Sequence, residues 1–283
     1  MGWKRNISIA VSNLSSVIGK FKKPRYGFRV LMYHSIRSLD LSTPSYGTLG
    51  NFTVHPDVFK RQINTLIESS SLSLVSFRDG WKTIPQDSHS VAITFDDGFN
   101  DNLYTVAPIL VELGIPFTVF ITTMPVSKRI KGYLIPSEII ELSKLPGVEI
   151  GAHGVTHTKL TELGDKELIN ELVSSKHYLE DIIGKEIQTI SYPHGAIDAR
   201  VKEAVARAGY LVGGDSRFGV NTCSHDPLVL RRTVIMSLDS QKVFEQKIEG
   251  GWDWYESAEP KYRKLELFFR KRAANRHSQK YDD

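Results

Sequence analysis

Asp96 and Asp97 are two neighbouring acids at the end of a predicted strand. They follow a run rich in β-branched residues, 91–94, and precede Gly98 and a polar turn. Two carboxylates at the end of a buried strand are costly to ionise unless a cation or hydrogen bonds compensate them. Asp-Asp-Gly is also common in solvated turns, where an Asp caps the next helix. On its own, therefore, the pair is more typical of a turn than of a catalytic site.

Two histidines further along, His153 and His157, have a spacing that suits a shared metal ion. Imidazoles four residues apart lie on the same side of a helical turn, or of a loop folded like one. An isolated pair at this spacing is more often two unrelated surface histidines. With a carboxylate from an earlier strand, the pair supplies two nitrogens and one oxygen and leaves positions for water and substrate. That composition is typical of a catalytic zinc-type site and not of a closed structural one.

The segments around these residues alternate between strand and helix. The predicted strands are residues 28–33, 72–77, 91–95, 117–121, 148–150, 187–192 and 210–213, and two further short extended runs are predicted at residues 228–230 and 233–235. The predicted helices are residues 56–67, 102–113, 136–145, 166–183, 198–208 and 243–248, and Pro108 is expected to kink the second. Such alternation is typical of parallel βαβ units. We expect an α/β fold of about seven strands in a closed or nearly closed barrel, with a doubly wound open sheet as the alternative.

In parallel α/β folds the working residues gather at the carboxyl ends of the strands. The predicted ends hold His34, then Asp96 with Asp97, then His153 with His157, and finally Tyr192, Pro193 and His194. Three of these four ends contain histidine, although the chain has only nine histidines. The sequence therefore predicts a histidine-rich site at one end of the sheet.

Composition and charge exclude several classes of protein. The single cysteine, Cys223, excludes an intrachain disulfide and a cysteine-based zinc site. No glycine-rich phosphate-binding motif stands at a strand-to-helix turn, which disfavours a nucleotide cofactor. The net charge of +4 is unevenly spread over the 283 residues. Residues 1–25 have six Lys or Arg and no acid, residues 261–283 have eight against three acids, and residues 26–260 have 22 against 29.

Both basic ends contain apolar residues at helical or near-helical spacing, in residues 7–21 and 265–269. Such segments either pack on their own domain, which is the commoner case, or lie on an anionic membrane. Trp252, Trp254 and Tyr255 either pack a C-terminal extension, which we favour, or offer flat faces for sugar rings. No apolar stretch is long enough to span a membrane, and the N-terminus lacks a secretory cleavage signal. We expect a location that is cytoplasmic or peripheral to the membrane, and no nucleic-acid partner.

Taken together, these residues resemble the motifs of the polysaccharide deacetylases of the NodB-homology type, carbohydrate esterase family 4. Residues 94–98 (Thr-Phe-Asp-Asp-Gly) resemble its first motif, residues 153–157 its second, and residues 191–195 (Ser-Tyr-Pro-His-Gly) its third. Residues 114–120 are similar to its helix-to-strand passage. Residues 31–36 and 52–59 further resemble the branch that acts on poly-N-acetylglucosamine. The resemblance divides the chain into a basic amphipathic segment (1–25), a catalytic domain (26–250) and a basic, aromatic-rich extension (251–283).

The resemblance implies a distorted (β/α)7-type barrel that hydrolyses acetyl groups from glycans containing N-acetylhexosamine. Asp97, His153 and His157 would hold a divalent metal, zinc in the first place and cobalt, nickel or manganese as alternatives. Asp96 would be the general base. A metal with three protein ligands lowers the pKa of bound water and polarises the acetyl carbonyl. The backbone N–H of His194 would stabilise the oxyanion.

Tyr192 and Pro193, in the third motif, would then lie at the substrate. Two positions depart from the family pattern. Ser191 stands where an arginine usually orients the base, so Arg231 or Arg232 is expected to supply that charge, and Arg231 is a candidate for substrate binding. The family's Leu-x-His motif, whose histidine protonates the leaving amine, has no counterpart.

The candidates for this general acid are His34, His194 and His225. The departures leave open a glycan-binding protein without catalysis. A non-haem iron oxygenase would also use two histidines and one carboxylate. We disfavour that alternative because nothing in the sequence predicts its β-rich core.

Overall fold

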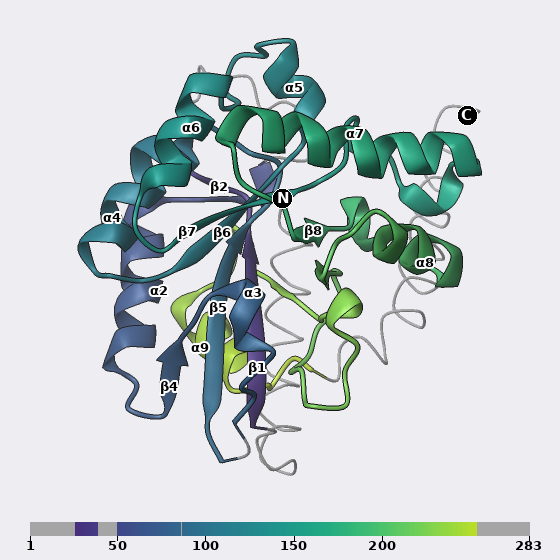
Figure 1. Cartoon of the computed structure of the whole chain (residues 1–283). Coiled ribbons are helices and arrows are strands. Elements are labelled where there is room, and N and C mark those ends of the chain that lie inside the picture. The colour runs from purple at the N-terminus through teal and green to yellow at the C-terminus, as the bar shows by residue number, and fades with distance from the viewer. Residues whose placement is uncertain (1–25, 39–49, 86, 254–283) are drawn as a thin grey trace, which may run out of the picture.

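The computed structural model describes residues 26–38, 50–85 and 87–253 of the chain (Figure 1). The basic segment expected at residues 1–25 lies outside this part. So do residues 254–283, which include Trp254, Tyr255 and most of the expected C-terminal extension. Within the described part, no helix is long and apolar enough to cross a membrane.

A parallel β-sheet forms the centre of the molecule (Figure 1). Its main path runs β10-β1-β5-β6-β7-β8-β9, and β4 pairs with β5 beside this path. The strands are β1 (Gly27–Tyr33), β4 (Leu72–Leu74), β5 (His89–Phe95), β6 (Phe117–Ile121), β7 (Val148–Ala152), β8 (Thr189–Ser191), β9 (Val212–Gly214) and β10 (Thr233–Val234). Each neighbouring pair of these strands is parallel, so their carboxyl ends meet at one end of the sheet.

One segment connects the two edges of this sheet. Leu230 forms a parallel bridge to Gly214, the last residue of β9. Three residues further on, Thr233 of β10 pairs with Leu31 of β1. The sheet is therefore a half-barrel whose edges are joined by residues 230–234, and the predicted distorted barrel is confirmed.

Helices surround the sheet (Figure 1). They are α2 (Pro56–Glu68), α3 (Phe77–Gly80), α4 (Ala107–Glu112), α5 (Thr123–Ser127), α6 (Pro136–Lys144), α7 (Asp165–Ile183), α8 (Ala199–Arg207) and α9 (Gln241–Ile248). The longest, α7, buries Leu168, Leu172 and Leu179 on one face and ends at Gly184. Gly184 has φ of 66°, a left-handed conformation that only glycine adopts without strain. Shorter elements are β2 (Ser35–Ile36), β3 (Thr53–Val54), η2 (Asn102–Val106), η3 (Leu160–Glu162), η4 (Pro193–Gly195) and η5 (Pro227–Val229).

Three elements differ from the prediction. The strand predicted at residues 72–77 ends at Leu74, because Ser76 caps α3 by accepting a hydrogen bond from the Asp79 amide. The predicted helix 102–113 begins as the π-helix η2, and α4 follows with Pro108 in its first turn. Proline has no amide hydrogen to donate, and the turn before it is the wider π-type, in which the Ala107 amide donates to the Asn102 carbonyl. Residues 228–230 form the turn η5 and one bridge instead of a strand.

Alternation along the strands separates two apolar regions. One region, between the sheet and the helices, contains Leu31, Ile93 and Phe117. The other fills the barrel with Phe28, Val30, Phe77, Ala92, Phe120, Val212 and Leu230. Side chains alternate in direction along a strand, so every second residue faces the barrel interior. After Ala92 the next interior residues are Thr94 and Asp96, and after Leu230 the next is Arg232. The barrel interior thus becomes polar and charged toward the carboxyl ends of the strands.

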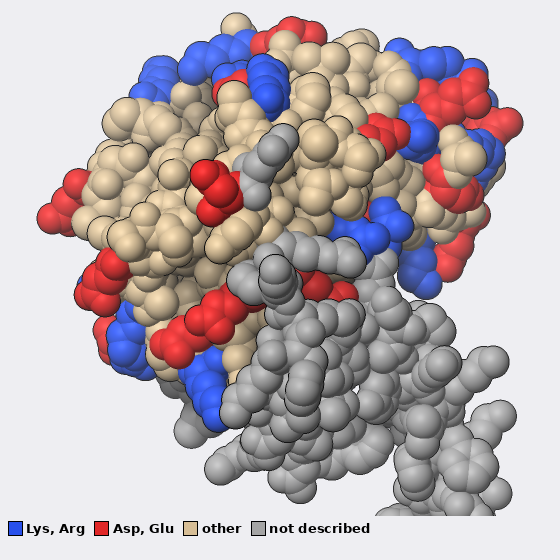
Figure 2. Space-filling model, turned by 90° about the horizontal axis from the view of Figure 1, so that it is seen from below, with Lys and Arg blue, Asp and Glu red and all other residues tan. Residues whose placement is uncertain are grey.

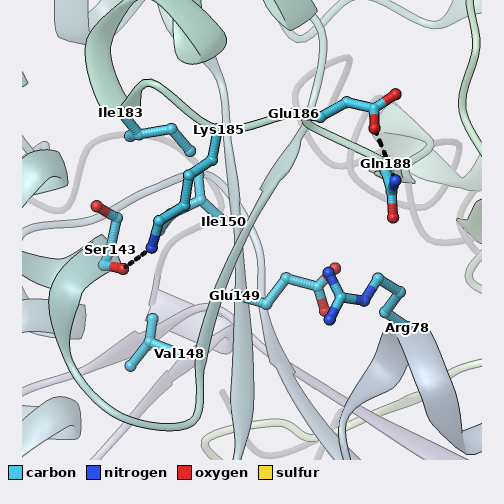
Figure 3. A pocket seen from close by; sticks show the side chains of 9 residues that line it. All are labelled: Arg78, Ser143, Val148, Glu149, Ile150, Ile183, Lys185, Glu186 and Gln188. Carbon is cyan, nitrogen blue, oxygen red and sulfur yellow. Dashed lines mark hydrogen bonds between the residues drawn. The ribbon is translucent and has the colours of Figure 1, made fainter.

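A pocket opens near the amino ends of β7 and β8 (Figure 3). Figure 3 shows the side chains of Arg78 and Glu149 pointing toward one another in it, and Lys185 donates to the Ser143 carbonyl at 3.1 Å. Burial raises the pKa of Glu149, although the Arg78 charge opposes this shift. The pocket lies at the opposite end of the strands from the predicted site, at the base of the barrel.

Candidate active site and metal centre

Asp97, His153 and His157 come together at the carboxyl ends of β5 and β7. One potential ligand atom from each residue lies within 4.8 Å of the other two. Oδ1 of Asp97 is 3.5 Å from Nε2 of His153 and 3.2 Å from Nε2 of His157. The structure therefore brings together the three residues whose types and spacing predicted a metal site.

The backbone at these ligands has an unusual conformation. Asp97 and His157 have positive φ angles of 76° and 63°, in the left-handed region. This conformation costs a non-glycine residue on the order of 1 kcal/mol or more and persists only where the surroundings enforce it. Gly98 follows with φ of 79°, and its carbonyl accepts a hydrogen bond from the Leu134 amide at 3.0 Å. Strained backbone of this kind concentrates at functional sites.

A hydrogen bond to the backbone fixes the ring of His153 through Nδ1 and leaves Nε2 available as a ligand. Its Nδ1 lies 2.8 Å from the carbonyl oxygen of Ser191, which can only accept, so Nδ1 carries the proton. Nε2 is then unprotonated in the neutral ring and faces Asp97. A metal-ligating histidine is held in the same way, with its other nitrogen bound to a carbonyl or carboxylate.

The oxygen at the centre of this group fits a cation. Oδ1 of Asp97 is buried and receives no hydrogen bond from the described residues, although two imidazole nitrogens lie close to it. Burial alone would raise the pKa of Asp97, but His153 and His157 bring it well below its ordinary value. A buried carboxylate oxygen without a donor is unfavourable unless a cation compensates it. Two nitrogens and one oxygen suit a divalent metal of the zinc type.

Asp96, the first acid of the pair, is bound by Arg232. Nη1 and Nη2 of Arg232 donate to the two carboxylate oxygens at 2.7 and 2.8 Å, a bidentate contact. Ser191 completes the group, since its hydroxyl donates to Oδ2 of Asp96 at 3.0 Å and lies 2.7 Å from Nη2 of Arg232. Burial alone would raise the pKa of Asp96, but Arg232 lowers it to about 2. Asp96 is therefore ionised at neutral pH.

Two contacts with the barrel interior fix the position of Arg232. Its Nε donates to the carbonyl of Asp215 at 2.8 Å, and its guanidinium lies 5.4 Å from the centre of the Phe120 ring. Of the two arginines considered from the sequence, Arg232 supplies the charge at Asp96. Arg231 instead donates to the Phe218 carbonyl at 3.2 Å.

His34 and His194 both lie near the group formed by Asp97, His153 and His157. His34 follows β1, stacks on Phe52 with ring centres 4.6 Å apart, and has a buried Nδ1 without a hydrogen-bond partner. Burial lowers the pKa of His34, and the charges of Asp97 and Asp96 oppose this. His194 has φ of 59°, its ring centre is 4.5 Å from that of His157, and its Nε2 lies 3.1 Å from the His157 carbonyl oxygen.

The remaining residues singled out from the sequence have other surroundings. Tyr192 is fully buried, and its hydroxyl donates to the Leu228 carbonyl at 2.7 Å. Pro193 is buried at the start of η4. His225 lies in a turn, where its Nδ1 accepts from the Thr222 amide at 3.0 Å. Trp252 is 7% exposed and stacks on Phe218, so the expected packing role of this residue is confirmed.

Three residues of the site region were not identified from the sequence. Phe99 and Tyr133 form an aromatic pair with ring centres 4.8 Å apart. Burial raises the pKa of Tyr133, and the charge of Asp97 raises it further. No pattern marks them, because each stands in an irregular segment. Glu171 is a buried acid on α7 that binds the loop between His153 and His157. An acid beside Leu172 on the apolar face of a predicted helix is a signal that could have indicated it.

The chain is similar to known deacetylases. Residues 83–213 match the family described as polysaccharide deacetylase. The chain is 25% identical over 226 residues to the putative polysaccharide deacetylase YxkH of Bacillus subtilis, covering 78% of this chain and 76% of that protein. It is 30% identical over 129 residues to a peptidoglycan-N-acetylglucosamine deacetylase of Bacillus cereus, covering 45% and 56% of the two chains. Among solved structures, the Streptococcus pyogenes deacetylase PplD in complex with acetate superimposes with a TM-score of 0.69 at 22% identity, covering 79% of this chain and 98% of that one.

Proposed function

Since the chain belongs to the polysaccharide deacetylase family, we propose that it uses a divalent metal to hydrolyse N-acetyl groups of a glycan that contains N-acetylhexosamine. The family provides the reaction class, deacetylation of a polysaccharide. One observation carries the metal dependence: a buried oxygen of Asp97 that receives no hydrogen bond from the described residues lies between the Nε2 atoms of His153 and His157. The ionised Asp96 lies beside them, with Oδ2 3.9 Å from Nε2 of His153.

Asp97, His153 and His157 would hold the metal, with zinc as the first choice and cobalt, nickel or manganese as alternatives. A bound divalent ion at such a site acidifies water and polarises the acetyl carbonyl. Asp96 would accept the proton of the attacking water. Arg232 keeps Asp96 ionised at neutral pH and fixes the orientation of its carboxylate.

We propose His34 as the general acid that protonates the leaving amine. Its Nδ1 is buried without a partner, and stacking on Phe52 fixes the ring. A histidine with a lowered pKa gives up its proton readily once it is protonated, and the charges of Asp96 and Asp97 favour protonation. His194 is less suitable for this role, because its Nε2 is engaged with the His157 carbonyl.

For the oxyanion we propose the backbone N–H of His194. The left-handed conformations of His194 and Gly195, φ 59° and 66°, turn this segment back over the metal ligands. Tyr192 and Pro193 precede it, and the buried Tyr192 anchors the turn through its bond to Leu228. In this proposal, Tyr192 and Pro193 act on the substrate through the position of that N–H.

The proposed substrate is a glycan rich in N-acetylglucosamine. A relative from Bacillus cereus is named for the N-acetylglucosamine of peptidoglycan. The motifs at residues 31–36 and 52–59 resemble the poly-N-acetylglucosamine branch. The ring of Tyr133, which packs on the buried Phe99 near Asp97, offers a flat face of the kind that suits a pyranose ring.

Acetate release tests this proposal. The purified protein is incubated with chitooligosaccharides and with poly-N-acetylglucosamine, with and without a chelator. We expect release that the chelator abolishes and zinc or cobalt restores. Retained binding of these glycans without acetate release in any metal would instead support the non-catalytic alternative. Release that persists at full rate in chelator would contradict metal dependence.

The positions of the chain ends suggest a membrane as a second partner. Tyr26, the first described residue, packs against His89 with ring centres 5.3 Å apart, and Asp253, the last, pairs with Arg29 at 2.9 Å. Both lie toward the amino ends of the strands, and the seven residues of β1 span about 20 Å to the opposite end. Figure 2 shows that acidic and basic side chains of the described residues are interspersed around this face. In this proposal the basic segments 1–25 and 261–283 provide the contact and keep the protein peripheral to an anionic membrane.

Co-sedimentation with vesicles tests the membrane contact. We expect binding to vesicles that contain anionic lipid and release as salt is raised, because exposed charges are screened. The triple variant Lys20→Gln, Lys22→Gln, Lys23→Gln should bind more weakly. Equal binding to neutral and anionic vesicles, or none to either, would contradict the contact without affecting the catalytic proposal.

A further inference from the structure

We propose that Glu171 is a positioning residue for the metal ligand His157, and that it sets the affinity of the site for its divalent ion. This inference rests on the metal-dependent function proposed above. Glu171 lies on α7, away from the three ligand atoms themselves. It acts through the loop of residues 153–157 that joins the two histidine ligands.

Glu171 binds this loop with three hydrogen bonds. Its Oε2 accepts from the amides of Val155 at 2.6 Å and of Thr156 at 3.1 Å. Its Oε1 accepts from the hydroxyl of Thr156 at 2.7 Å. The carboxylate is 5% exposed, so water competes little for these bonds. One buried side chain thus fixes the two residues that immediately precede His157.

Among the described residues, the other backbone hydrogen bonds of residues 154–156 involve carbonyl groups and do not bind the Val155 and Thr156 amides. The carbonyls of Gly154 and Val155 accept hydrogen bonds from the amides of Thr123 and Met124, at 3.1 and 2.9 Å. These contacts hold the acceptor side of the loop against α5. The donors on its other side, the Val155 and Thr156 amides, have Glu171 as their acceptor. The loop is held between two helices, and α7 contributes this one carboxylate.

Because Glu171 lies so close to the loop, residue 154 has no room for a side chain. A Cβ at Gly154 would lie 2.8 Å from Oε2 of Glu171, and Gly154 has φ of 72°. Immediately after the two residues that Glu171 binds, His157 adopts its own positive φ of 63°. A conformation that is unfavourable for histidine needs fixed neighbours on either side. On the amino side of His157, Glu171 fixes the neighbouring residues. On the carboxyl side, the His157 carbonyl is in contact with Nε2 of His194.

A carboxylate suits this position better than its amide. The three loop groups that face Glu171 are all donors, and an ionised carboxylate is acceptor-only. A glutamine can keep its oxygen on the two amides only by turning its NH2 group to the Thr156 hydroxyl, which must then change from donor to acceptor. Groups that orient metal ligands typically contribute 10- to 100-fold to metal affinity. We therefore expect the metal affinity to fall in steps as these bonds are removed.

A graded set of variants tests this inference. Zinc affinity is measured by competition with a chromogenic chelator for the full chain and for Glu171→Ala, Glu171→Gln and Thr156→Val. We expect Glu171→Ala to bind zinc about 10- to 100-fold more weakly, and Glu171→Gln to follow in the same direction. Thr156→Val removes one of the three bonds and should have a smaller effect. Glu167→Gln, an exposed acid one turn earlier on α7, is the matched control and should stay within about twofold.

The cobalt-loaded proteins give a second readout that loss of stability alone would not change. A displaced His157 alters the ligand field, so the visible spectrum of the cobalt-loaded Glu171→Gln protein should differ from that of the unaltered chain. Wild-type zinc affinity and spectrum in both Glu171→Gln and Thr156→Val would overturn the inference. If the unaltered chain binds no zinc or cobalt, the proposed metal function fails instead, so the two failures are distinguishable. If Glu171→Ala does not fold, the other two variants decide.

Discussion

Asp96 and Asp97 are adjacent in the sequence but have different surroundings, and this difference assigns their roles. Asp96 faces into the barrel, where Arg232 and Ser191 satisfy both of its oxygens. Asp97 follows in a left-handed turn that directs Oδ1 to two imidazoles and leaves it without a donor. A fully bonded carboxylate is suited to a fixed base, and an unpaired one to a cation.

This division predicts different effects of two substitutions. Asp97→Ala removes a ligand, so zinc binding and acetate release should both be lost. Asp96→Asn keeps the three ligands, so zinc should still bind while turnover falls by about 100-fold or more. Metal content by atomic absorption and acetate release measure the two effects. Equal metal content and full activity in both variants would contradict the assignment.

The ion pair of Asp96 and Arg232 also predicts a dependence of stability on pH. The pKa of Asp96 is lowered from 3.8 to about 2, so the pair stabilises the fold above pH 4 and this stabilisation is lost as the pH falls toward 2. A difference of this size corresponds to about 2 kcal/mol. Urea unfolding of the metal-free protein between pH 5 and pH 2.5 measures it. Asp96→Asn should lose less of its unfolding free energy over this range than the unaltered chain, and an equal loss would count against the pair.

The elements that carry the site meet because the strands are parallel. Asp96 follows β5, His153 follows β7, Ser191 ends β8, and Arg232 immediately precedes β10. Gly214, the last residue of β9, lies directly beneath the guanidinium. A Cβ there would approach the Cδ and Nε atoms of Arg232 to 2.7 and 2.8 Å. The end of β9 therefore requires glycine for the arginine to reach Asp96.

Gly214→Ala should consequently displace Arg232 from Asp96 without touching the metal ligands. We expect the turnover number to fall about 10- to 100-fold, since a displacement of about 1 Å has effects of this size, while zinc affinity stays unchanged. Gly50→Ala, where a Cβ meets nothing within 4 Å, is the control. Loss of zinc binding in Gly214→Ala, or unchanged turnover, would contradict this role.

Regular elements and local motifs could be predicted from the sequence, whereas long-range polar contacts could not. The strand at 117–121 and the helix ending before Gly184 follow from apolar spacing and a glycine stop, and both are confirmed. Asp97, His153 and His157 follow from residue type at strand ends. The sequence left the replacement for the motif arginine undecided between Arg231 and Arg232, because that contact joins residues 136 positions apart. Tyr133 stands in an irregular loop that no local pattern encodes, and the local signal for Glu171 is an acid on the apolar face of a predicted helix, which does not show what it binds.

At the scale of the whole molecule, the barrel has two different ends. The carboxyl end holds the proposed metal site, and the amino end holds the pocket around Glu149 and the latch between Arg29 and Asp253. Arg29 is 1% exposed and makes a bidentate contact with Asp253 at 2.9 and 3.0 Å. This latch ties the last described residues to β1.

Asp253→Asn should destabilise the protein while leaving the site intact. Removing one partner of a buried ion pair leaves the other charge uncompensated, which costs about 3 kcal/mol in a fully buried pair and somewhat less here, since Asp253 is 23% exposed. The control is Asp165→Asn, which breaks an exposed pair with Arg200 and should cost less than about 1 kcal/mol. Urea unfolding measures both. Equal stabilities of the two variants would contradict the importance of the latch.

The central claim is that Asp97, His153 and His157 bind one divalent ion. An anomalous difference map from a crystal soaked in zinc tests it most directly. We predict a single peak about 2.0–2.2 Å from Oδ1 of Asp97 and from Nε2 of both histidines. A map without a peak at these three residues, or with zinc held elsewhere, would contradict the account.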